Sequence, residues 1–365
     1  MVAGGCSSDS ESPETTAAAA ADVTQAPVTT DAPVTTDALV TTDAPVATVA
    51  PDTTDTPVTT DAPVSTVSPD TTDAPGATDA PETTEVAPSE PFTTTTITQS
   101  FVDSSRPTAA TSSSSELPTR TIATTIVYPT APGPFPLIVL NHGLTGLPSK
   151  LTRLSNAWAA AGYVVAMPAF PLTNGSVAGA SGNAGDVVNQ PGDVSFVIDS
   201  VLALSDDDSS PLFGQVDGEH VGVAGHSLGA ATTYGVALNR CCRDERIEAI
   251  VILAGFVYIA SADNDYSLSL PVMIVHGDAD PVLSISLDQG AYDELAGPKW
   301  FVTLLAGSHS TGIEDLGTPH DAIVDQATTD FWDVYLSSRP AEPDAIAALR
   351  TDAVVDGLST LQTSE

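Results

Sequence analysis

From Phe92 onward, short apolar runs alternate with helix-like segments, and this alternation restricts the fold more than any other feature of the sequence. Uniformly apolar strands separated by helices indicate a mostly parallel central sheet covered by helices on both faces, because such strands are buried on both sides. We therefore expect an α/β fold whose reactive residues follow the carboxyl ends of the strands. The expected strands lie at 93–101, 121–128, 137–140, 163–167, 221–224, 247–254, 272–276 and 300–304.

Two of the expected helices have recognisable ends. An alanine-rich helix over 149–161 should stop at Gly162, because glycine readily adopts the left-handed conformation that closes a helix. A second helix should be capped by Asp193, because the apolar residues after it recur at the i, i+3 and i+4 spacing of one helix face.

The segment before Phe92 has a different composition. Residues 1–91 contain no Lys, Arg or aromatic residue, and from Ala26 they repeat the unit A-P-V-T-T-D. Such a segment buries too little apolar surface to offset the entropy of ordering, so we expect a disordered Thr/Pro/Asp-rich spacer over 7–91. It could be an O-glycosylated stalk or a plain linker. The folded domain is expected at 92–338 and a C-terminal tail at 339–365.

The charge balance excludes several partners. The chain carries 47 acidic and 10 basic residues, a net charge of −37, and its only lysines are Lys150 and Lys299. An acidic surface repels phosphate backbones and anionic headgroups, so we expect neither nucleic-acid binding nor a polybasic membrane contact. No apolar run reaches the roughly 18 residues that a spanning helix needs.

The three cysteines have separate expected roles. Small residues lead into Cys6 and a polar stretch follows, as at the cleavage site of a bacterial lipoprotein signal, so 1–6 is interpreted as the remnant of such a signal. A lipid on Cys6 would tether the protein to the outer face of the membrane, so the expected location is extracellular or cell-surface. Cys241 and Cys242 are expected to be a reduced, buried pair. No metal site is expected, because the His and Cys spacing of one is missing.

The sequence G-H-S-L-G at 225–229 follows an apolar strand and opens a helical segment. A nucleophilic serine needs this context, because a sharp turn exposes the Ser227 hydroxyl and the helix N-terminus faces the developing oxyanion. Ser227 is therefore the candidate nucleophile, and the Leu228 amide is a candidate oxyanion donor. A second donor is expected at the Leu144 amide, in the N-H-G-L-T-G segment that follows the strand at 137–140.

A serine nucleophile needs a base and an acid that orients it. Among six histidines, His309 follows the last strand in a short loop and is the candidate base, with His320 as the alternative. His226 is expected to point away from the nucleophile. Asp280 follows the preceding strand in H-G-D-A-D-P and is the candidate acid, with Asp278 as the alternative. The order serine, aspartate, histidine is that of an α/β-hydrolase.

These motifs resemble those of serine α/β-hydrolases, in the branch of bacterial platelet-activating-factor acetylhydrolase-like proteins, polyester hydrolases and dienelactone-hydrolase-like esterases. The resemblance covers 92–338 and implies acyl-ester hydrolysis without a cofactor. Dienelactone hydrolases carry a cysteine where this chain has Ser227, and polyester hydrolases usually carry a tryptophan where it has Gly255-Phe256, which counts against polyester activity. The similar stretches are 135–137, 141–143, 161–165, 189–193, 225–229, 241–244 and 276–280.

The expected function is hydrolysis of short to medium acyl esters through an acyl-enzyme. Residues 255–271, between two strands, are too few for a large cap domain, so the site should be open and lined by Leu144, Thr145, Leu228 and Phe256. A small-molecule or lipid-like ester is the expected substrate, and the domain is expected to act as a monomer. The same triad would also suit a lipase, phospholipid or polyester acyl hydrolase or an amidase. The alternative from another class is a stalked surface adhesion protein without catalysis.

Overall fold

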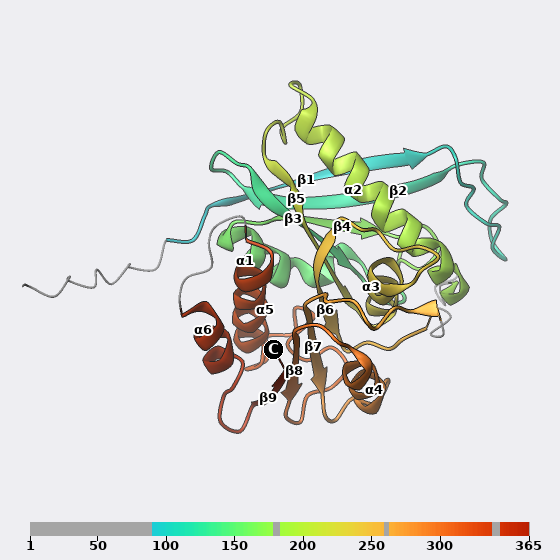
Figure 1. Ribbon diagram of the computed structural model, residues 1–365. Helices are drawn as coiled ribbons and strands as arrows, with labels where there is room; N and C mark the ends of the chain where they lie inside the picture. Colours follow the sequence, from blue (N-terminus) through green and yellow to red (C-terminus); the bar gives the residue numbers. More distant parts are fainter. Residues whose placement is uncertain (1–89, 178–182, 259–262, 338–343, 365) are drawn as a thin grey trace, which may run out of the picture. The chain divides into compact units, whose positions relative to one another are not determined.

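The structure is a computed structural model that describes residues 90–177, 183–258, 263–337 and 344–364. The N-terminal segment expected to be a spacer, together with Cys6, lies outside the described residues. The described residues form a nine-stranded sheet in the order β1-β2-β4-β3-β5-β6-β7-β8-β9 (Figure 1). The strands are β1 (Thr94–Asp103), β2 (Arg120–Pro129), β3 (Phe135–Asn141), β4 (Val164–Ala169), β5 (Val216–His226), β6 (Ile247–Leu253), β7 (Val272–Gly277), β8 (Lys299–Leu304) and β9 (Ser359–Ser364).

The sheet is parallel at its centre and antiparallel at both edges. Strands β3 to β8 run in the same direction, whereas β1, β2 and β9 pair antiparallel with their neighbours. This confirms the expected α/β-hydrolase-type fold with a mostly parallel sheet. Parallel strands end at one edge of the sheet, so the loops after β3, β5, β7 and β8 meet there.

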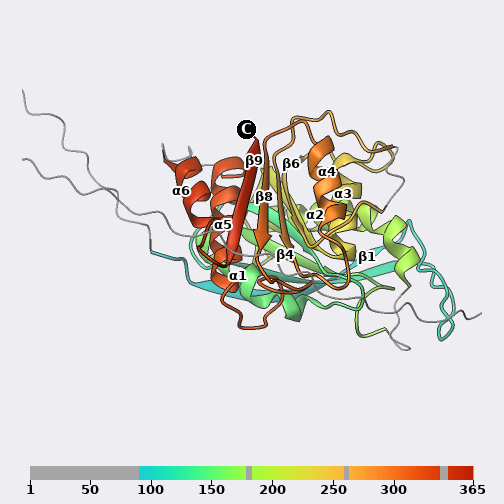
Figure 2. The ribbon, with the colours of Figure 1, turned by 90° about the horizontal axis from the view of Figure 1, so that it is seen from below.

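Helices cover both faces of the sheet, as Figure 2 shows. Side chains alternate along each strand, so Val223 and Ile252 pack into one apolar cluster while Ala224 and Val251 pack into the other. The largest side chains of the second cluster are Trp158, Trp300 and Trp332, and the rings of Trp158 and Trp332 meet edge to face at 5.6 Å. One face carries α2 (Gln190–Asp206), α3 (Leu228–Leu238) and α4 (Ser286–Glu294), and the other carries α1 (Thr152–Ala161), α5 (Asp321–Tyr335) and α6 (Ala345–Asp352).

Helix α1 ends as the sequence predicts, whereas α2 begins earlier than predicted. Gly162 closes α1 with a φ of 109°. Helix α2 begins at Gln190, directly after the 3-10 helix η2 (Ala184–Asn189), so Asp193 is not its cap. The Asp193 carboxylate is instead buried and accepts two bonds of 2.6 Å from the Arg120 guanidinium. Asp193, which the sequence pattern predicted to be a helix cap, is therefore part of a buried ion pair instead.

The C-terminal residues are part of the domain, contrary to the expected tail at 339–365. Helix α6 packs against α5, and β9 pairs with β8 along its whole length, from Ser359 opposite Leu304 to Ser364 opposite Lys299. The short S-T-L-Q-T-S strand carries a single aliphatic residue, Leu361, which packs partly buried against the second apolar cluster. An edge strand of this composition has no periodicity that distinguishes it from a polar tail.

The two adjacent cysteines form a disulfide, contrary to the reduced, buried pair that we expected. They lie in the turn after α3, where Cys241 is exposed and Cys242 is half-buried. Asn239 shapes this turn, because its side-chain oxygen accepts the Cys241 N–H at 3.1 Å and its amide donates to Asn264 at 3.0 Å.

Candidate active site

Ser227 occupies the sharp turn between β5 and α3. Its φ of 55° and ψ of −116° lie where an L-residue is strained. The glycines on either side are needed, because a Cβ on Gly225 would collide with the Gly229 backbone and a Cβ on Gly229 would collide with the Asn141 backbone. The turn presents the partly exposed Ser227 side chain at the C-terminal edge of the sheet.

The structure brings Ser227, His309 and Asp280 together from the ends of three strands. The Ser227 hydroxyl lies 2.9 Å from His309 Nε2, and His309 Nδ1 lies 2.7 Å from Asp280 Oδ2. With Nδ1 protonated, the imidazole donates to the carboxylate and leaves Nε2 free to accept the serine proton. These contacts have the geometry of a nucleophile, a base and an orienting acid.

The two alternative residues lie elsewhere. Asp278 is exposed and accepts the Ala306 N–H at 2.6 Å, which fixes the turn between the β7 and β8 exit loops. His320 Nε2 lies 3.1 Å from the Leu305 carbonyl and immediately precedes α5. Neither side chain contacts Ser227, so the geometry favours Asp280 and His309 over both.

Asp280 is held as an ionised acceptor. Its Oδ1 accepts the N–H groups of Val282 at 2.7 Å and Leu283 at 3.0 Å, and its side chain is wholly buried. Burial alone would raise the pKa of Asp280, but the Leu283 amide, the His309 ring and the Val282 amide outweigh burial and lower the pKa below its ordinary value. The carboxylate therefore stays charged where the base needs a partner.

Arg153 of α1 anchors the loop that carries His309. Its guanidinium donates to the Gly312 carbonyl at 2.7 Å and to the Asp321 carbonyl at 3.0 Å, and it also pairs with Asp325. One side chain thus ties the middle of the connection between β8 and α5 to the first turn of α5. The sequence analysis did not identify this residue, because its partners lie far along the chain.

The oxyanion candidates lie on the two loops that meet at Ser227. A Cβ on Gly143 would lie 3.0 Å from the Ser227 Cβ, so only glycine lets the β3 exit loop approach the nucleophile this closely. Leu228 is the first residue of α3, so its N–H has no partner within the helix. The Leu144 and Leu228 amides make no backbone hydrogen bond among the described residues, whereas the neighbouring Thr145 amide donates to Thr173 at 2.7 Å.

Two buried histidines support these loops. His142 accepts the Phe170 N–H at Nε2 and bonds the Gly143 carbonyl at 2.7 Å through Nδ1, and burial lowers its pKa to about 4. We expected His226 to point away from the nucleophile, but its side chain lies beside His309. Its ring lies against the His309 ring, with the centroids 4.9 Å apart and the planes tilted by 43°, and its Nε2 lies 3.0 Å from the His309 carbonyl. Burial, together with the neighbouring His309, lowers the pKa of His226 to about 3, so the ring is a neutral support for the base.

The expected lining residues border the same edge. Leu144 is 39% exposed, while Thr145 is half-buried with a φ of 59°. Leu228 packs with Val187 and Ala231, and the half-buried Phe256 covers this cluster from the β6 exit loop. The apolar side chains thus come from loops on both sides of the Ser227 turn.

A further pair, His276 and Asp288, lies directly behind the acid and was missed by the sequence analysis. His276 Nε2 lies 3.2 Å from Asp280 Oδ2, and His276 Nδ1 lies 2.8 Å from Asp288 Oδ2 on α4. The Gly255 N–H donates to the same Asp288 oxygen at 2.7 Å, and the Tyr234 hydroxyl lies 3.3 Å from the other oxygen. The histidine of H-G-D-A-D was the available signal, because it ends a strand beside the acid.

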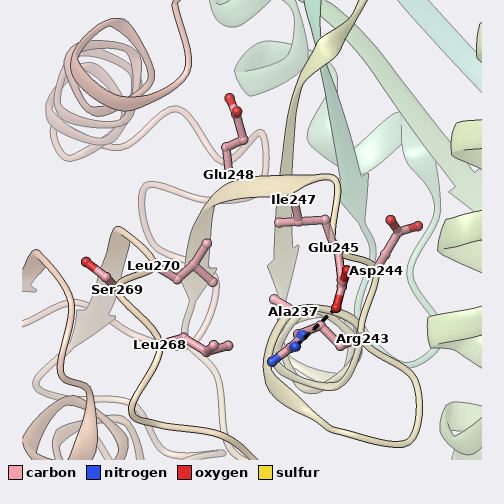
Figure 3. Close-up of a pocket in the computed structure, with 9 residues that line it drawn as sticks. All are labelled: Ala237, Arg243, Asp244, Glu245, Ile247, Glu248, Leu268, Ser269 and Leu270. Atoms are coloured by element: carbon pink, nitrogen blue, oxygen red, sulfur yellow. Dashed lines mark hydrogen bonds and ion pairs between the residues drawn. The ribbon is translucent and has the colours of Figure 1, made fainter.

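A cavity lies at the opposite edge of the sheet. It has a volume of about 440 Å³ and is drawn in Figure 3, where Arg243 pairs with Glu245 at 3.4 Å. Ile247 begins β6 and Leu270 precedes β7, so the cavity opens at the N-terminal ends of the strands, away from Ser227. Its lining residues are Ala237, Arg243, Asp244, Glu245, Ile247, Glu248, Leu268, Ser269 and Leu270.

No group of His, Cys, Asp and Glu side chains in the described ranges is arranged to hold a metal ion. No helix in the part of the chain that the structure describes is long and apolar enough to cross a membrane.

Known proteins share this fold and this sequence pattern. Residues 87–317 match the sequence profile of a family described as PETase: PET hydrolase-like. A solved structure, a ferulic acid esterase from Streptomyces cinnamoneus, superimposes with a TM-score of 0.54 at 20% identity and covers 77% of this chain and 98% of its own. No curated protein sequence matches the chain. Because the profile spans well over half of the sequence, the chain belongs to the PET hydrolase-like family of α/β-hydrolases and is an ester hydrolase.

Proposed function

We propose that this protein is a serine carboxylic-ester hydrolase that acts through an acyl-enzyme. The observation that carries the proposal is the chain of contacts from Ser227 Oγ to His309 Nε2 at 2.9 Å and from His309 Nδ1 to Asp280 Oδ2 at 2.7 Å. Ser227 is the nucleophile, His309 is the general base and acid, and Asp280 orients His309 and balances the charge that the ring gains.

The reaction proceeds in two halves. Ser227 Oγ attacks the ester carbonyl carbon while its proton moves to His309 Nε2, and the oxyanion is bound by the Leu144 and Leu228 amides. His309 then gives the proton to the departing alkoxide, which leaves as the alcohol. In the second half, water attacks the acyl-serine, and its proton passes through His309 back to Ser227 as the acid is released.

The substrates proposed are esters with short to medium acyl chains. Ser227 and His309 are both partly exposed, and the connection between β6 and β7 spans only residues 254–271. Leu144 and Phe256 offer apolar contact on either side of the nucleophile without enclosing it. An open site of this kind gains little from additional methylene groups once the acyl chain extends into water.

The test is hydrolysis of nitrophenyl esters from acetate to palmitate by the full chain and by Ser227→Ala. We expect kcat to fall by about 10⁴-fold or more in the variant, with a preference for short chains in the parent. Ser209→Ala is the matched control, because this exposed serine lies beyond α2, far along the chain from the site. Trapping with a slow ester should add one acyl group to the peptide that carries Ser227. Full activity in Ser227→Ala would overturn the mechanism.

Aromatic polyester is the second candidate substrate, although Phe256 stands where polyester hydrolases usually carry tryptophan. It is favoured by the family profile and by exposed apolar side chains on three exit loops, Leu144, Tyr258 and Val282. The Phe256 and Tyr258 rings also meet edge to face at 5.9 Å, so the β6 exit loop presents an aromatic pair. Release of terephthalate from polymer film, absent in Ser227→Ala, would support this substrate. Hydrolysis of soluble nitrophenyl esters alone would contradict it.

We also propose that the enzyme works outside the cell, tethered through Cys6. The Cys241–Cys242 disulfide supports an oxidising location, because disulfides persist mainly in secreted and surface proteins. Cell fractionation should find the parent in the membrane fraction and Cys6→Ala in the medium. Recovery of both proteins in the cytosol would contradict the proposal.

A further inference from the structure

His276 lies behind the acid with both ring nitrogens against oxygen atoms. It is the penultimate residue of β7 and is wholly buried. Its Nδ1 lies 2.8 Å from Asp288 Oδ2, while its Nε2 lies 3.1 Å from the Leu283 carbonyl oxygen and 3.2 Å from Asp280 Oδ2. None of these oxygens can donate a proton when both carboxyl groups are ionised.

The contacts determine the charge of the ring. A neutral imidazole carries one N–H, so one of its nitrogens would direct a lone pair at an oxygen lone pair in this setting. A ring protonated at both nitrogens satisfies every contact. Asp288 is already fixed as an acceptor by the Gly255 N–H at 2.7 Å. Burial alone would lower the pKa of His276, but the Asp288 bond, the Leu283 carbonyl and the Asp280 charge outweigh burial and raise the pKa above its ordinary value.

Asp280 Oδ2 is shared between two imidazoles. It accepts from His309 Nδ1 at 2.7 Å and faces His276 Nε2 at 3.2 Å. We propose that His276 is a positioning residue. Its imidazolium is anchored on Asp288 and holds Asp280 Oδ2 in place for His309. Its positive charge also lets His309 work as a base at lower pH. This inference rests on the triad proposed above and extends it to five side chains.

The direction of the pH effect follows from the charges around the two rings. The negative charge of Asp280 favours protonation of His309. The positive charge of His276, on the other side of Asp280 Oδ2, partly cancels that effect. The groups that face His276 are Asp280, Asp288 and, beyond them, Tyr234 and His309. When the His276 charge is lost, His309 should therefore bind its proton more strongly. Activity should then fall first at the acid end of the pH profile.

The groups that face His309 complete this description. They are Ser227, Asp280 and the adjacent His226 ring, which stays neutral. Behind His226, Glu314 lies 3.8 Å from Nδ1 and also pairs with Lys150 at 3.4 Å. None of these partners changes in the variants below.

The first experiment is the pH profile of kcat/KM for a nitrophenyl ester with the full chain and with His276→Gln. We expect the acid limb to move to higher pH by about one unit, with KM nearly unchanged because His276 does not reach the substrate. His220→Gln is the matched control, because His220 lies at the other edge of the sheet and bonds Glu248 at 2.8 Å. A merely structural role would lower kcat equally at all pH values.

Two further measurements keep the test decisive if His276→Gln does not fold. Asp288→Asn removes the anion that keeps His276 protonated, so its acid limb should move in the same direction. In the parent protein, nitrogen-15 NMR of the six histidines above neutral pH should show one buried imidazolium with two N–H groups. This spectrum does not depend on activity.

The outcomes separate the two proposals. An acid limb that stays in place in both variants, or a His276 ring with a single N–H, overturns the positioning role while the triad stands. Activity that survives in Ser227→Ala overturns the proposed function, and the NMR spectrum still decides the charge on His276. A shifted limb together with two N–H signals supports the extended network.

Discussion

Arg120 and His276 are buried cations that each lie between two carboxylates, yet the two clusters differ in what they can do. The Arg120 guanidinium binds Asp193 with two bonds of 2.6 Å and Asp186 with bonds of 2.6 and 3.1 Å. All of its contacts fix the start of α2 against β2. The His276 cluster has the same composition of charges, but one of its carboxylates also accepts from His309, which contacts Ser227.

The comparison teaches that a buried ion pair is not by itself a sign of function. Arginine keeps its charge at any accessible pH and satisfies both carboxylates by geometry, which suits a fixed structural joint. Histidine keeps its charge only while neighbouring anions stabilise the protonated ring, so the charge can respond to changes beside it. The His276 cluster differs from the Arg120 cluster because Asp280 connects it, through His309, to the partly exposed Ser227.

The largest difference should appear when one carboxylate of each cluster is replaced by the amide. Asp280→Asn should lower kcat by about 10⁴-fold, because the amide no longer holds His309 in the tautomer that accepts the serine proton. Asp193→Asn should leave kcat within a few-fold and lower the free energy of unfolding instead. Ester kinetics and urea unfolding of both variants check this. Equal losses of kcat would remove the distinction between the clusters.

Removal of the guanidinium should give the next largest effect. Arg120→Met removes the guanidinium from the buried Asp186 carboxylate and leaves Asp193 with Arg106 alone, so it should lower the free energy of unfolding by about 3–5 kcal/mol. Arg106→Met is the control, because Arg106 bonds Asp193 at 2.9 Å from a partly exposed position and should cost much less. Urea denaturation at neutral pH measures both. A loss below about 1 kcal/mol for Arg120→Met would mean that the cluster is dispensable.

The pH dependence of stability should separate the two cations. The folded pKa of His276 is raised, so its stabilising contribution is present below the unfolded value of about 6.5 and is lost as pH rises through the folded value. The loss of stability in His276→Gln should therefore be larger near pH 6 than near pH 9.5. The loss in Arg120→Met should be the same at both. Parallel curves for the two variants would contradict a titrating charge at His276.

The smallest expected effect concerns a buried carboxyl that lies beside other carboxyls. Burial, partly offset by Gln326, raises the pKa of Asp330 on α5 to about 7, with a further contribution from Asp352 and Asp333 included in that value. The unfolded state loses this proton first, so stability falls as pH rises from about 4 to about 7, and Asp330→Asn should stabilise the protein by about 1 kcal/mol at pH 8 and by little at pH 4. Thermal unfolding measures this, with exposed Asp356→Asn as the control. Stabilisation that is equal at both pH values would point to another cause.

The sequence predicted the central sheet and the loops that carry the candidate triad, because these depend on local patterns. Apolar runs define β3 to β8, and motifs directly after them place Ser227, Asp280 and His309 at one edge. The rest depends on contacts between distant segments. Asp288 reaches His276 only because α4 packs against β7, and His226 turns toward His309 because the β8 loop passes over the Ser227 turn. The periodicity of a short stretch of sequence cannot predict such contacts between distant segments.

The Cys241–Cys242 disulfide has a thermodynamic consequence of an unusual kind. Most disulfides stabilise a protein by shortening the loops that the unfolded chain can explore. This one closes a ring that contains only its own two residues, so almost no chain entropy is removed from the unfolded state. A reducing agent should therefore leave the melting temperature nearly unchanged. What it would alter is the shape of the turn at 239–246, which leads into the cavity at the far edge of the sheet.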